Sequence, residues 1–542
     1  MTRRSIHIPG ADTQNGTTCR DVNEAASTMK NALGREVPEK LGNRVLRPYT
    51  GAFATTHTGY KAARTQKTVR PGENKVLHSI EEAIEATGLS NGMTISFHHS
   101  FRQGDRLVNL VIDACAQMGL KDLRLFPTAL FPVHEPVIEH IKSGVVTRIE
   151  GSMNGPVGVF ISQGGKLRRP AVLRSHGGRW RAVEAGDVKI DVAFIAAPQA
   201  DPYGNANGIN GTTPCGPITY SRVDAQYARK TVVVTGALAP YPAHPFEIQQ
   251  GWTDYVVVVD EIGDPESISS GTLQITRSPM RLRIARLATD AVVSSGYLKD
   301  GFSFQGGAGG ISLAVTKFVG EAMAKAGIVG SFAMGGGTEL LVDILNQRLI
   351  HTILDTQAFD IAAINSLREN PNHVLMDPGF YANHDSRGCA TYMLDAAFLG
   401  ATEVDLNFNV NVNTHSDGQL LHGIGGHQDV ASGAKMALIT IPTLRGRLPV
   451  IVDRVTTVTT PGEVIDVVVT ERGIAVNPKR QDLKERFCAA GLPVRKLEAI
   501  KEEVDKLIHP SRKPIFGNEV IALVEWRDGT VIDTVRKVIG WK

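Results

Sequence analysis

Two hydrophobic patterns alternate along the chain and predict strands and helices in turn. Short apolar runs, mostly rich in valine, occur at residues 192–196, 231–234 and 255–259. Runs of this kind are typical of parallel strands that are buried on both faces of a sheet. Elsewhere apolar residues recur at helical spacing, as in residues 77–87 and 107–118. The first half of the chain is therefore predicted to be an α/β domain.

The second half of the chain restarts the same rhythm. Strands are predicted there at residues 301–304, 328–332, 373–376, 404–412, 437–441, 450–458 and 464–469, with a helix at 313–326. The first half has two further predicted strands, at residues 92–97 and 123–126. The pattern predicts two tandem open α/β domains, residues 41–290 and 291–542, divided near residues 285–300. Residues 1–40 are polar and weakly periodic, and we expect an arm that packs on a neighbour or stays mobile.

Composition narrows the class of protein. The 542 residues are 42% hydrophobic and 21% charged, with a formal net charge of +3. So small a charge argues against a nucleic-acid-binding protein. No apolar run approaches the roughly 20 residues that cross a bilayer, and the polar N-terminus does not resemble a secretory signal. We expect a cytoplasmic protein that has no membrane span.

The cysteines add little chemistry to this picture. The five cysteines are far apart and form no C-x-x-C pair (Cys19, Cys115, Cys215, Cys389 and Cys488). That spacing favours neither a disulfide framework nor a zinc site. We expect reduced thiols that are mostly buried.

The strongest local signal is a glycine-rich loop between a predicted strand and a predicted helix. It contains Gly306, Gly307, Gly309 and Gly310. Glycines allow backbone amides to approach a ligand closely, and a helix N-terminus favours negative charge. A phosphate or the oxyanion of a thioester under attack could use such a loop. It is not a Walker loop, because no Gly-Lys-Ser/Thr follows. Tight turn packing is the alternative.

A second glycine-rich loop contains Gly423, Gly425 and Gly426. Polar groups flank it: His415, His427 and Lys435. The histidine spacing fits neither H-E-x-x-H nor a structural zinc site, so no metal is predicted. Groups that bind a polycarboxylate fit better.

Three other polar segments are ambiguous from spacing alone. His98 and His99 are adjacent, so on a strand at most one of them faces a given site. Residues 354–360 read only as a polar stretch before a helix. Glu471 and Arg472 end an apolar strand, which suits either functional charges in an α/β fold or a surface turn.

Taken together, these segments resemble the citrate lyase alpha chain. The resemblance rests on FQGGAGGISLAV, ILDTQAFD, NVNVNTHSDG, GIGGHQDVASGAK, the run RGRLPVIVDRVTTVTTPGEVIDVVVTERGIAVNP and, in the first half, HGGRWRAVEAGDVKIDVAFIAAPQADPYGNANG. It extends over about residues 40–540. It implies CoA-transferase-type domains, related to sugar-phosphate isomerases, with the active site at their interface.

The resemblance also implies an activity and partners. The family converts acetyl-[acyl-carrier protein] and citrate to citryl-[acyl-carrier protein] and acetate. It works in an oligomeric complex with a beta chain and an acyl-carrier (gamma) chain. No cofactor would be bound permanently, because the gamma chain carries the dephospho-CoA-derived arm; acetyl-CoA is a conceivable substitute in vitro.

One departure from related CoA-transferases is informative. Those that form a covalent enzyme thioester carry a nucleophilic glutamate where this chain has Gln357. A neutral amide cannot form the acyl anhydride that a carboxylate forms. The resemblance therefore implies direct attack of a citrate carboxylate on the thioester, through a mixed anhydride and without an acyl-enzyme.

Site roles follow from the resemblance as hypotheses. The first glycine loop, Gly306, Gly307, Gly309 and Gly310, would donate amides to the oxyanion, and Gln357 would orient the acyl group. Residues expected to bind citrate are His415, His427, Arg387, Glu471 and Arg472. Residues expected to bind the CoA-like arm are Gly423, Gly425, Gly426 and Lys435.

Rival functions stay open at this point. The nearest is the acyl-carrier transferase of malonate decarboxylase, and another is a free-CoA transferase or acyl-CoA hydrolase. From a different class, the chain could be a non-catalytic scaffold or a sugar-phosphate-sensing module.

Overall fold

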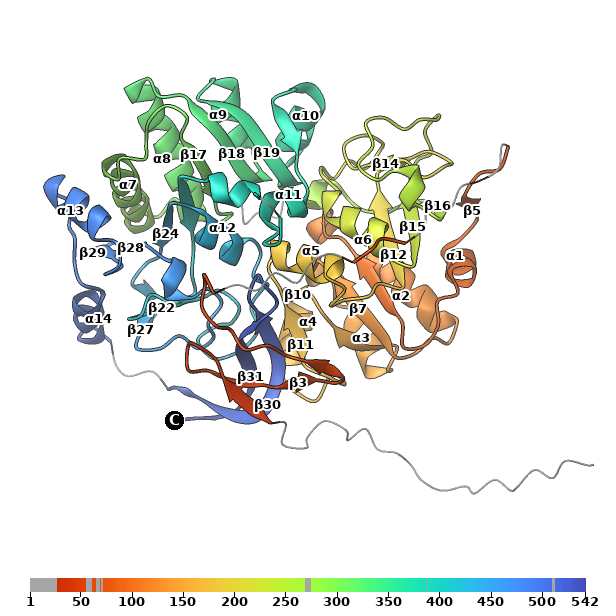
Figure 1. Cartoon of the computed structure of the whole chain (residues 1–542), viewed down its shortest axis with the longest axis horizontal. Coiled ribbons are helices and arrows are strands. Elements are labelled where there is room, and N and C mark those ends of the chain that lie inside the picture. Colours follow the sequence, from red (N-terminus) through yellow and green to blue (C-terminus); the bar gives the residue numbers. More distant parts are fainter. Residues whose placement is uncertain are drawn as a thin grey trace, which may run out of the picture.

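A computed structural model describes residues 27–54, 61–64, 69, 72–268, 274–386, 388–508 and 512–542. Two α/β units, one from each half of the chain, lie side by side in Figure 1. Each contains one large, mainly parallel sheet. The expected class, two tandem open α/β domains, is confirmed.

The first sheet has the strand order β5-β16-β15-β12-β6-β7-β9, and all its pairs are parallel. Its strands are β5 (Val76–Leu77), β6 (Thr94–Phe97), β7 (Leu123–Pro127), β9 (Val146–Ile149), β12 (Val192–Ala197), β15 (Lys230–Thr235) and β16 (Tyr255–Val258). The helices of this unit are α1 (Ile80–Thr87), α2 (Leu107–Gln117), α3 (Val137–Lys142), α4 (Pro156–Ser162), α5 (His176–Glu184) and α6 (Arg222–Tyr227). Every residue of β12 is buried, as its unbroken apolar run predicted.

Local signals place the helix ends within this unit. The Ser79 side chain accepts a hydrogen bond from the Glu82 amide and begins α1, and Gly88 ends it with a φ of 64°. The predicted helix over residues 77–87 is thus confirmed with a start three residues later.

The second sheet has the order β20-β19-β18-β17-β21-β24-β28-β29, with only β28 and β29 antiparallel. Its strands are β17 (Ser303–Gly306), β18 (Gly330–Gly337), β19 (Ile350–Ala358), β20 (His373–Leu375), β21 (Ala396–Leu399), β24 (Met436–Thr440), β28 (Val467–Thr470) and β29 (Gly473–Val476). The helices are α7 (Pro279–Ser294), α8 (Gly310–Ala326), α9 (Glu339–Asn346), α10 (Ile361–Glu369), α11 (Pro378–Ala382), α12 (His427–Gly433), α13 (Gln481–Ala489) and α14 (Leu497–Asp505).

Two features of the second unit differ from the prediction. The polar stretch 354–360 is largely the end of β19, a nine-residue strand whose polar carboxyl end hid its apolar start. The predicted strand 404–412 is instead a short antiparallel pair, β22 (Glu403–Asp405) and β23 (Val410–Asn411), in a small separate sheet with β27 (Ile451–Val452). A turn at Phe408, with a φ of 62°, separates the two strands.

The division between the units lies earlier than predicted. Helix α7 packs on α8, and its buried residues Ile284, Ala288 and Val292 join the core of the second sheet. The second unit therefore begins before residue 279, whereas the predicted boundary at 285–300 falls within and just after this helix.

The C-terminus returns to the first unit. Strands β30 (Pro514–Glu525) and β31 (Val531–Trp541) form a hairpin, and β30 pairs with β11 (Ala171–Leu173) of the first half. Strands β1 (Thr28–Lys30) and β2 (Glu36–Pro38) pair with each other, and Val37 packs with Val531. This N-terminal segment and the hairpin lie together along one side of the two units (Figure 1). From residue 27 on, the predicted arm thus packs within its own chain.

Within the described ranges, no helix has both the length and the apolar character needed to cross a membrane. Of the described cysteines, Cys115, Cys215 and Cys389 are buried and Cys488 is exposed. Cys19 lies outside the described residues.

Candidate functional site

The carboxyl ends of strands from the two sheets meet at Gln357 and His99. Gln357 is near the end of β19, and His99 follows β6 two residues after its end. His99 Nε2 is 3.0 Å from Gln357 Oε1, and Gln357 Nε2 donates to the His99 carbonyl at 3.3 Å. Ligands of open α/β folds bind beyond the carboxyl ends of the strands, so this junction is the natural place for a site.

Backbone and side-chain contacts hold Gln357 in place. The Asp355 carboxylate accepts hydrogen bonds from the amides of Gln357 (2.8 Å) and Gly337 (2.9 Å). A register shift between Gly335 and Gly336 in β18 accompanies this arrangement. The Gln357 side chain is only 5% exposed. Its amide is thus held rigidly at the contact between the two sheets.

His99 is a neutral imidazole in this position. Gln357 Oε1 can only accept a hydrogen bond, so Nε2 of His99 carries the proton and Nδ1 accepts from the Thr128 hydroxyl. Burial, together with the unfavourable effect of a second positive charge beside His176, His98 and Arg102, lowers the pKa of His99 well below its ordinary value. With these bonds to Gln357 and Thr128, both ring nitrogens of His99 are hydrogen-bonded within the protein.

Aromatic rings surround this contact on the side of the first sheet. The His99 ring stacks on His176 (centroids 5.7 Å apart) and on Phe131 (6.2 Å), and it meets the edge of Tyr220 at 4.7 Å. Tyr220 also meets His176 edge to face at 4.9 Å. Burial raises the pKa of the Tyr220 hydroxyl, which is hydrogen-bonded to Thr356, so this group stays protonated.

The second sheet contributes a tyrosine–glutamine pair to the same region. Gln305, at the end of β17, is 3.0 Å from the hydroxyl of Tyr381 on α11. A side chain at Gly426 would overlap that hydroxyl, which shows how closely the second glycine loop approaches Tyr381. The His176 amide donates to the Gly425 carbonyl at 3.0 Å. The end of β17 and the second glycine loop therefore converge on the ring cluster.

A buried carboxylate joins the start of α5 to α12. Asp429 accepts hydrogen bonds from the Ser175 hydroxyl (2.9 Å), the Gly177 amide (3.1 Å) and Arg527 Nε (3.0 Å). Ser175 in turn caps the Gly178 amide at 3.0 Å. These bonds fix the position of His176 relative to the second glycine loop.

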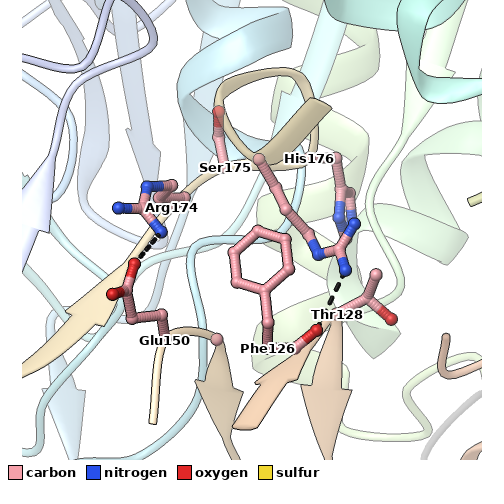
Figure 2. A pocket seen from close by; sticks show the side chains of 8 residues that line it. Phe126, Thr128, Glu150, Arg174, Ser175 and His176 are labelled. Carbon is pink, nitrogen blue, oxygen red and sulfur yellow. Dashed lines mark hydrogen bonds and ion pairs between the residues drawn. The ribbon is translucent and has the colours of Figure 1, made fainter. Parts of the chain in front are cut away.

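A small cavity opens beside this cluster (Figure 2). Its volume of about 10 Å³ suits roughly one water molecule. It is lined by Phe126, Thr128, Glu150, Gly151, Arg174, Ser175, His176 and Arg179. The arginines are already paired, Arg174 with Glu150 (2.8 Å) and Glu525 (2.6 Å), and Arg179 with Asp224 (2.7 Å). The His176 ring at this cavity is therefore open to a ligand, whereas the charges of Arg174 and Arg179 are already paired.

A further buried cation lies next to His99. The guanidinium carbon of Arg102 is 4.5 Å from the centre of the Phe359 ring, two residues beyond Gln357. Arg102 is one of the four non-glycine residues with a positive φ in the described ranges, at 51°. Strained backbone of this kind is often found at functional sites. Arg102 thus places a positive charge between the rings of Phe359 and Phe131, the latter stacked on His99.

The first glycine loop lies where the sequence placed it, but one of its amides is already used. Gly306 ends β17, Gly309 precedes α8 and Gly310 begins it. The Gly307 amide donates to the Phe398 carbonyl at 2.8 Å. It is therefore not available as an oxyanion donor, and the prediction for Gly307 is corrected on that ground.

The two histidines predicted to bind citrate, His427 and His415, have different surroundings. Both ring nitrogens of His427 are bound within the second unit, to the Thr460 hydroxyl (2.7 Å) and the Gly400 carbonyl (3.0 Å). Burial lowers the pKa of His427 to about 4, so the ring is neutral. His427 is therefore not retained as a citrate ligand. His415 is exposed on a turn closed by a hydrogen bond to Gln419.

Charged residues predicted for the site lie elsewhere in the second sheet. Glu471 and Arg472 follow β28, five strands from β19, or about 24 Å at the usual strand spacing. Glu471 binds Thr443, and Arg472 pairs with Glu503. Lys435 precedes β24 at the opposite, amino edge of the sheet and pairs with Asp395 at 2.7 Å. Glu471 and Arg472 are too distant to share a citrate with Gln357, and Lys435, predicted to bind the CoA-like arm, is paired at the amino edge of the sheet. Arg387 lies outside the described residues.

The glycines of the second loop, predicted to bind the CoA-like arm, lie beside His176 or against the first unit. Gly425 has a φ of 62° and lies against His176, while Gly423 packs on Ser152 of the first unit. Within the described ranges, no group of three or more metal-ligating side chains occurs.

Several residues at this junction were not predicted: Arg102, His176, Tyr220, Gln305 and Tyr381. Gln305 and His176 each lie inside a quoted motif, next to a strand end or a helix start, and that position was a usable signal. Tyr220 and Tyr381 reach the site only through the contact between the two units, which no local pattern reveals.

Comparison with known proteins shows the family of this chain. The family model "Citrate lyase, alpha subunit (CitF)" matches residues 73–538. The citrate lyase alpha chain of Klebsiella pneumoniae is 44% identical over 494 residues, 91% of this chain and 96% of its own length. That of Escherichia coli strain K12 is 45% identical over 88% of this chain and 93% of its own length.

Solved structures give the same result. A Streptococcus mutans structure, described as the alpha subunit of citrate lyase in complex with citrate, is 47% identical with a TM-score of 0.90, covering 94% of this chain and all of that chain. The malonate decarboxylase alpha subunit of Acinetobacter baumannii is 16% identical over 80% of this chain and 88% of that chain, with a TM-score of 0.59, and shows the fold alone. The matched model and relatives cover most of the chain, so it belongs to the citrate lyase alpha-subunit family and is a transferase of the citrate CoA-transferase type.

Proposed function

We propose that this chain exchanges acetate for citrate on an acyl-carrier thioester by direct carboxylate attack, with no acyl-enzyme. The observation that supports this most is the uncharged side chain of Gln357 at the contact between the two sheets, where its amide is held by His99. A carboxamide cannot act as the carboxylate nucleophile of a covalent relay.

The direct route balances without a proton. A citrate carboxylate oxygen bonds to the acetyl carbon, the C–S bond breaks, and the carrier sulfur leaves as a thiolate. The thiolate then bonds to the citryl carbonyl carbon of the mixed anhydride, and acetate leaves with the bridging oxygen. Charge is conserved at each step, so catalysis needs orientation and oxyanion stabilisation.

The residues of the junction suit these tasks. Gln357, anchored on both sides, would orient the acyl group. The amides of Gly309 and Gly310 at the start of α8 would face the developing oxyanion, since a helix N-terminus stabilises negative charge. Arg102, buried beside Phe359, would attract a carboxylate of citrate that does not react.

We infer that the carrier arm approaches along the first glycine loop and not, as the resemblance implied, along the second, where Gly423 and Gly426 pack against Ser152 and Tyr381. Gly309 has a φ of −79°, which any residue can adopt, and a side chain built there would meet no atom within 4 Å. The fold itself therefore does not require glycine at this position. We infer that glycine is needed there because a side chain would occupy the space of the thioester arm. We infer that the arm belongs to an acyl-carrier subunit of a multi-subunit citrate lyase, in which a second catalytic subunit cleaves the citryl thioester.

Citrate as the acceptor is supported by the Streptococcus mutans relative, whose structure was solved with citrate. The test is to incubate the purified chain with acetyl-loaded carrier and citrate, malonate or water, and to follow acetate release. We expect release with citrate alone. Release with malonate would assign the other acceptor, release in water would make the chain a hydrolase, and no release would favour a scaffold.

A further inference from the structure

His176 is the exception among the histidines around the junction. His98, His99 and His427 each use both ring nitrogens in hydrogen bonds to neighbouring protein groups. Neither ring nitrogen of His176 has a hydrogen-bond partner among the residues that the structure describes, although its backbone amide is bonded to Gly425. A neutral imidazole always carries one donor and one acceptor, so this ring has unused hydrogen-bonding capacity.

Ring packing, and not hydrogen bonding, holds His176 in place. His99 stacks on one face at 5.7 Å with an interplanar angle of 14°, and Tyr220 contacts the ring at 70°. Ser175 and Asp429 fix the backbone below it. Because packing orients the ring while its nitrogens stay open, a ligand can bind them without displacing a hydrogen bond within the protein.

The open Nε2 of His176 faces the second unit. His176 Nε2 is 3.9 Å from the position that a Cβ of Gly425 would take, so this edge of the ring faces the second glycine loop. His176 also lines the small cavity, where it lies on the same side as Thr128, away from the Arg174–Glu150 pair (Figure 2). Through His99 the ring is one residue removed from Gln357.

We propose that His176 is a catalytic residue whose ring N–H donates a hydrogen bond to the acyl oxygen of the carrier thioester and of the mixed anhydride. This inference rests on the proposed function, because it requires an acyl group at the junction. The ring stays neutral throughout and transfers no proton, which agrees with an exchange that consumes and releases none.

The electrostatics of the ring fit this role. Burial, reinforced by the charge of Arg179, lowers the pKa of His176 to about 4. A neutral imidazole is therefore present over the working range of the enzyme, and a neutral imidazole can stabilise a developing oxyanion as a hydrogen-bond donor.

The test compares His176→Phe, which keeps a stacking ring without a donor, with His176→Gln, which keeps an N–H donor. Removing one oxyanion donor lowers kcat by about 10²–10³-fold. We expect that loss for His176→Phe with KM for citrate nearly unchanged, and at least tenfold recovery of kcat in His176→Gln. The exposed His78, changed to Phe and to Gln, is the matched control.

Three results would overturn the inference. The first is a kcat of His176→Phe within threefold of the parent chain. The second is equal loss in both variants together with a lowered melting temperature, which would show that the ring only packs. The third is a loss that appears in KM alone. The parent chain is assayed in parallel, and its failure to release acetate with citrate would refute the proposed function itself.

Discussion

The two glycine loops of the second unit look alike in sequence but differ in why they need glycine. In the second loop, side chains at Gly423 and Gly426 would overlap Ser152 and the Tyr381 hydroxyl. In the first loop, Gly309 has ordinary backbone angles and open space around the missing side chain. The other glycines of the first loop, Gly306, Gly307 and Gly310, are also closely packed, so Gly309 is the position in this loop where room remains that no part of the described chain fills.

This difference distinguishes glycines that the packing requires, Gly423 and Gly426, from one that it does not, Gly309. The second loop brings α12 close to α5 and α11, and it thereby places His176 and Tyr381. The first loop leads from β17 into a 17-residue helix whose N-terminus is available to an anion. Substitutions at Gly423 and at Gly309 should therefore act on different quantities, stability at Gly423 and substrate handling at Gly309.

The largest effect is expected in the second loop. Gly423→Ala should lower the melting temperature and nearly abolish activity, because overpacking costs about 1–3 kcal/mol and Ser152 cannot move far within β10 (Ser152–Met153). The check is thermal unfolding with acetate release on the same samples. The double variant Gly423→Ala/Ser152→Gly should recover most of the lost stability; no recovery would mean that the clash is not the cause.

A smaller effect, on activity alone, is expected in the first loop. Gly309→Ala should leave the melting temperature unchanged and raise KM for the acetyl carrier about tenfold, a change of 1.4 kcal/mol in binding. Steady-state kinetics with varied carrier measure it. Gly540→Ala on β31, where a Cβ would also meet only an ordinary contact, serves as the control. A destabilised Gly309→Ala would remove the contrast between the loops.

Lowering the pH should lower the stability of the region around the second glycine loop. The pKa values of His176 and His427 are both about 4 in the folded chain, below the ordinary value of 6.5, because burial disfavours the charged ring. Their contribution to stability is complete above pH 6.5 and is lost as the pH falls through about 4. Melting temperatures measured between pH 7 and pH 4 should decline, and His427→Gln should flatten part of that decline. An equal slope in the variant would contradict the assignment.

The smallest effect is expected far from both loops. Arg472→Gln and Lys435→Gln should each change kcat and KM less than twofold, since these residues pair with Glu503 and Asp395 at other edges of the sheet. A KM for citrate raised tenfold or more by either change would return that residue to the site. Arg102→Gln, measured alongside, should raise KM for citrate.

Much of the fold could be predicted from the sequence, because buried parallel strands such as β12 and β15 are short runs of apolar residues. Strand β19 was missed because its last residues, which lie at the candidate site, are polar and interrupt the hydrophobic pattern. The C-terminal hairpin and its pairing with β11 could not be predicted, since that contact spans about 350 residues and has no local signature.

Candidate-site residues that lie in a recognised motif were predicted, and residues that only folding brings together were missed. Gln357 and the glycine loops were found through the family resemblance. Charged residues at strand ends, such as Arg472, were assigned without knowing the strand order, and that order separates them from β19. The rings of Tyr220 and Tyr381 come from connections whose sequences resemble ordinary loops.

The route of the oxygen atoms tests the central claim most directly. In a single turnover, with enzyme in excess over acetyl carrier, citrate labelled with ¹⁸O in its carboxylates is supplied and the released acetate is analysed by mass spectrometry. Direct attack predicts that the first acetate carries one ¹⁸O atom from citrate. Unlabelled acetate in that first turnover would show that an enzyme carboxylate or water supplied the oxygen, and it would contradict the direct exchange at Gln357.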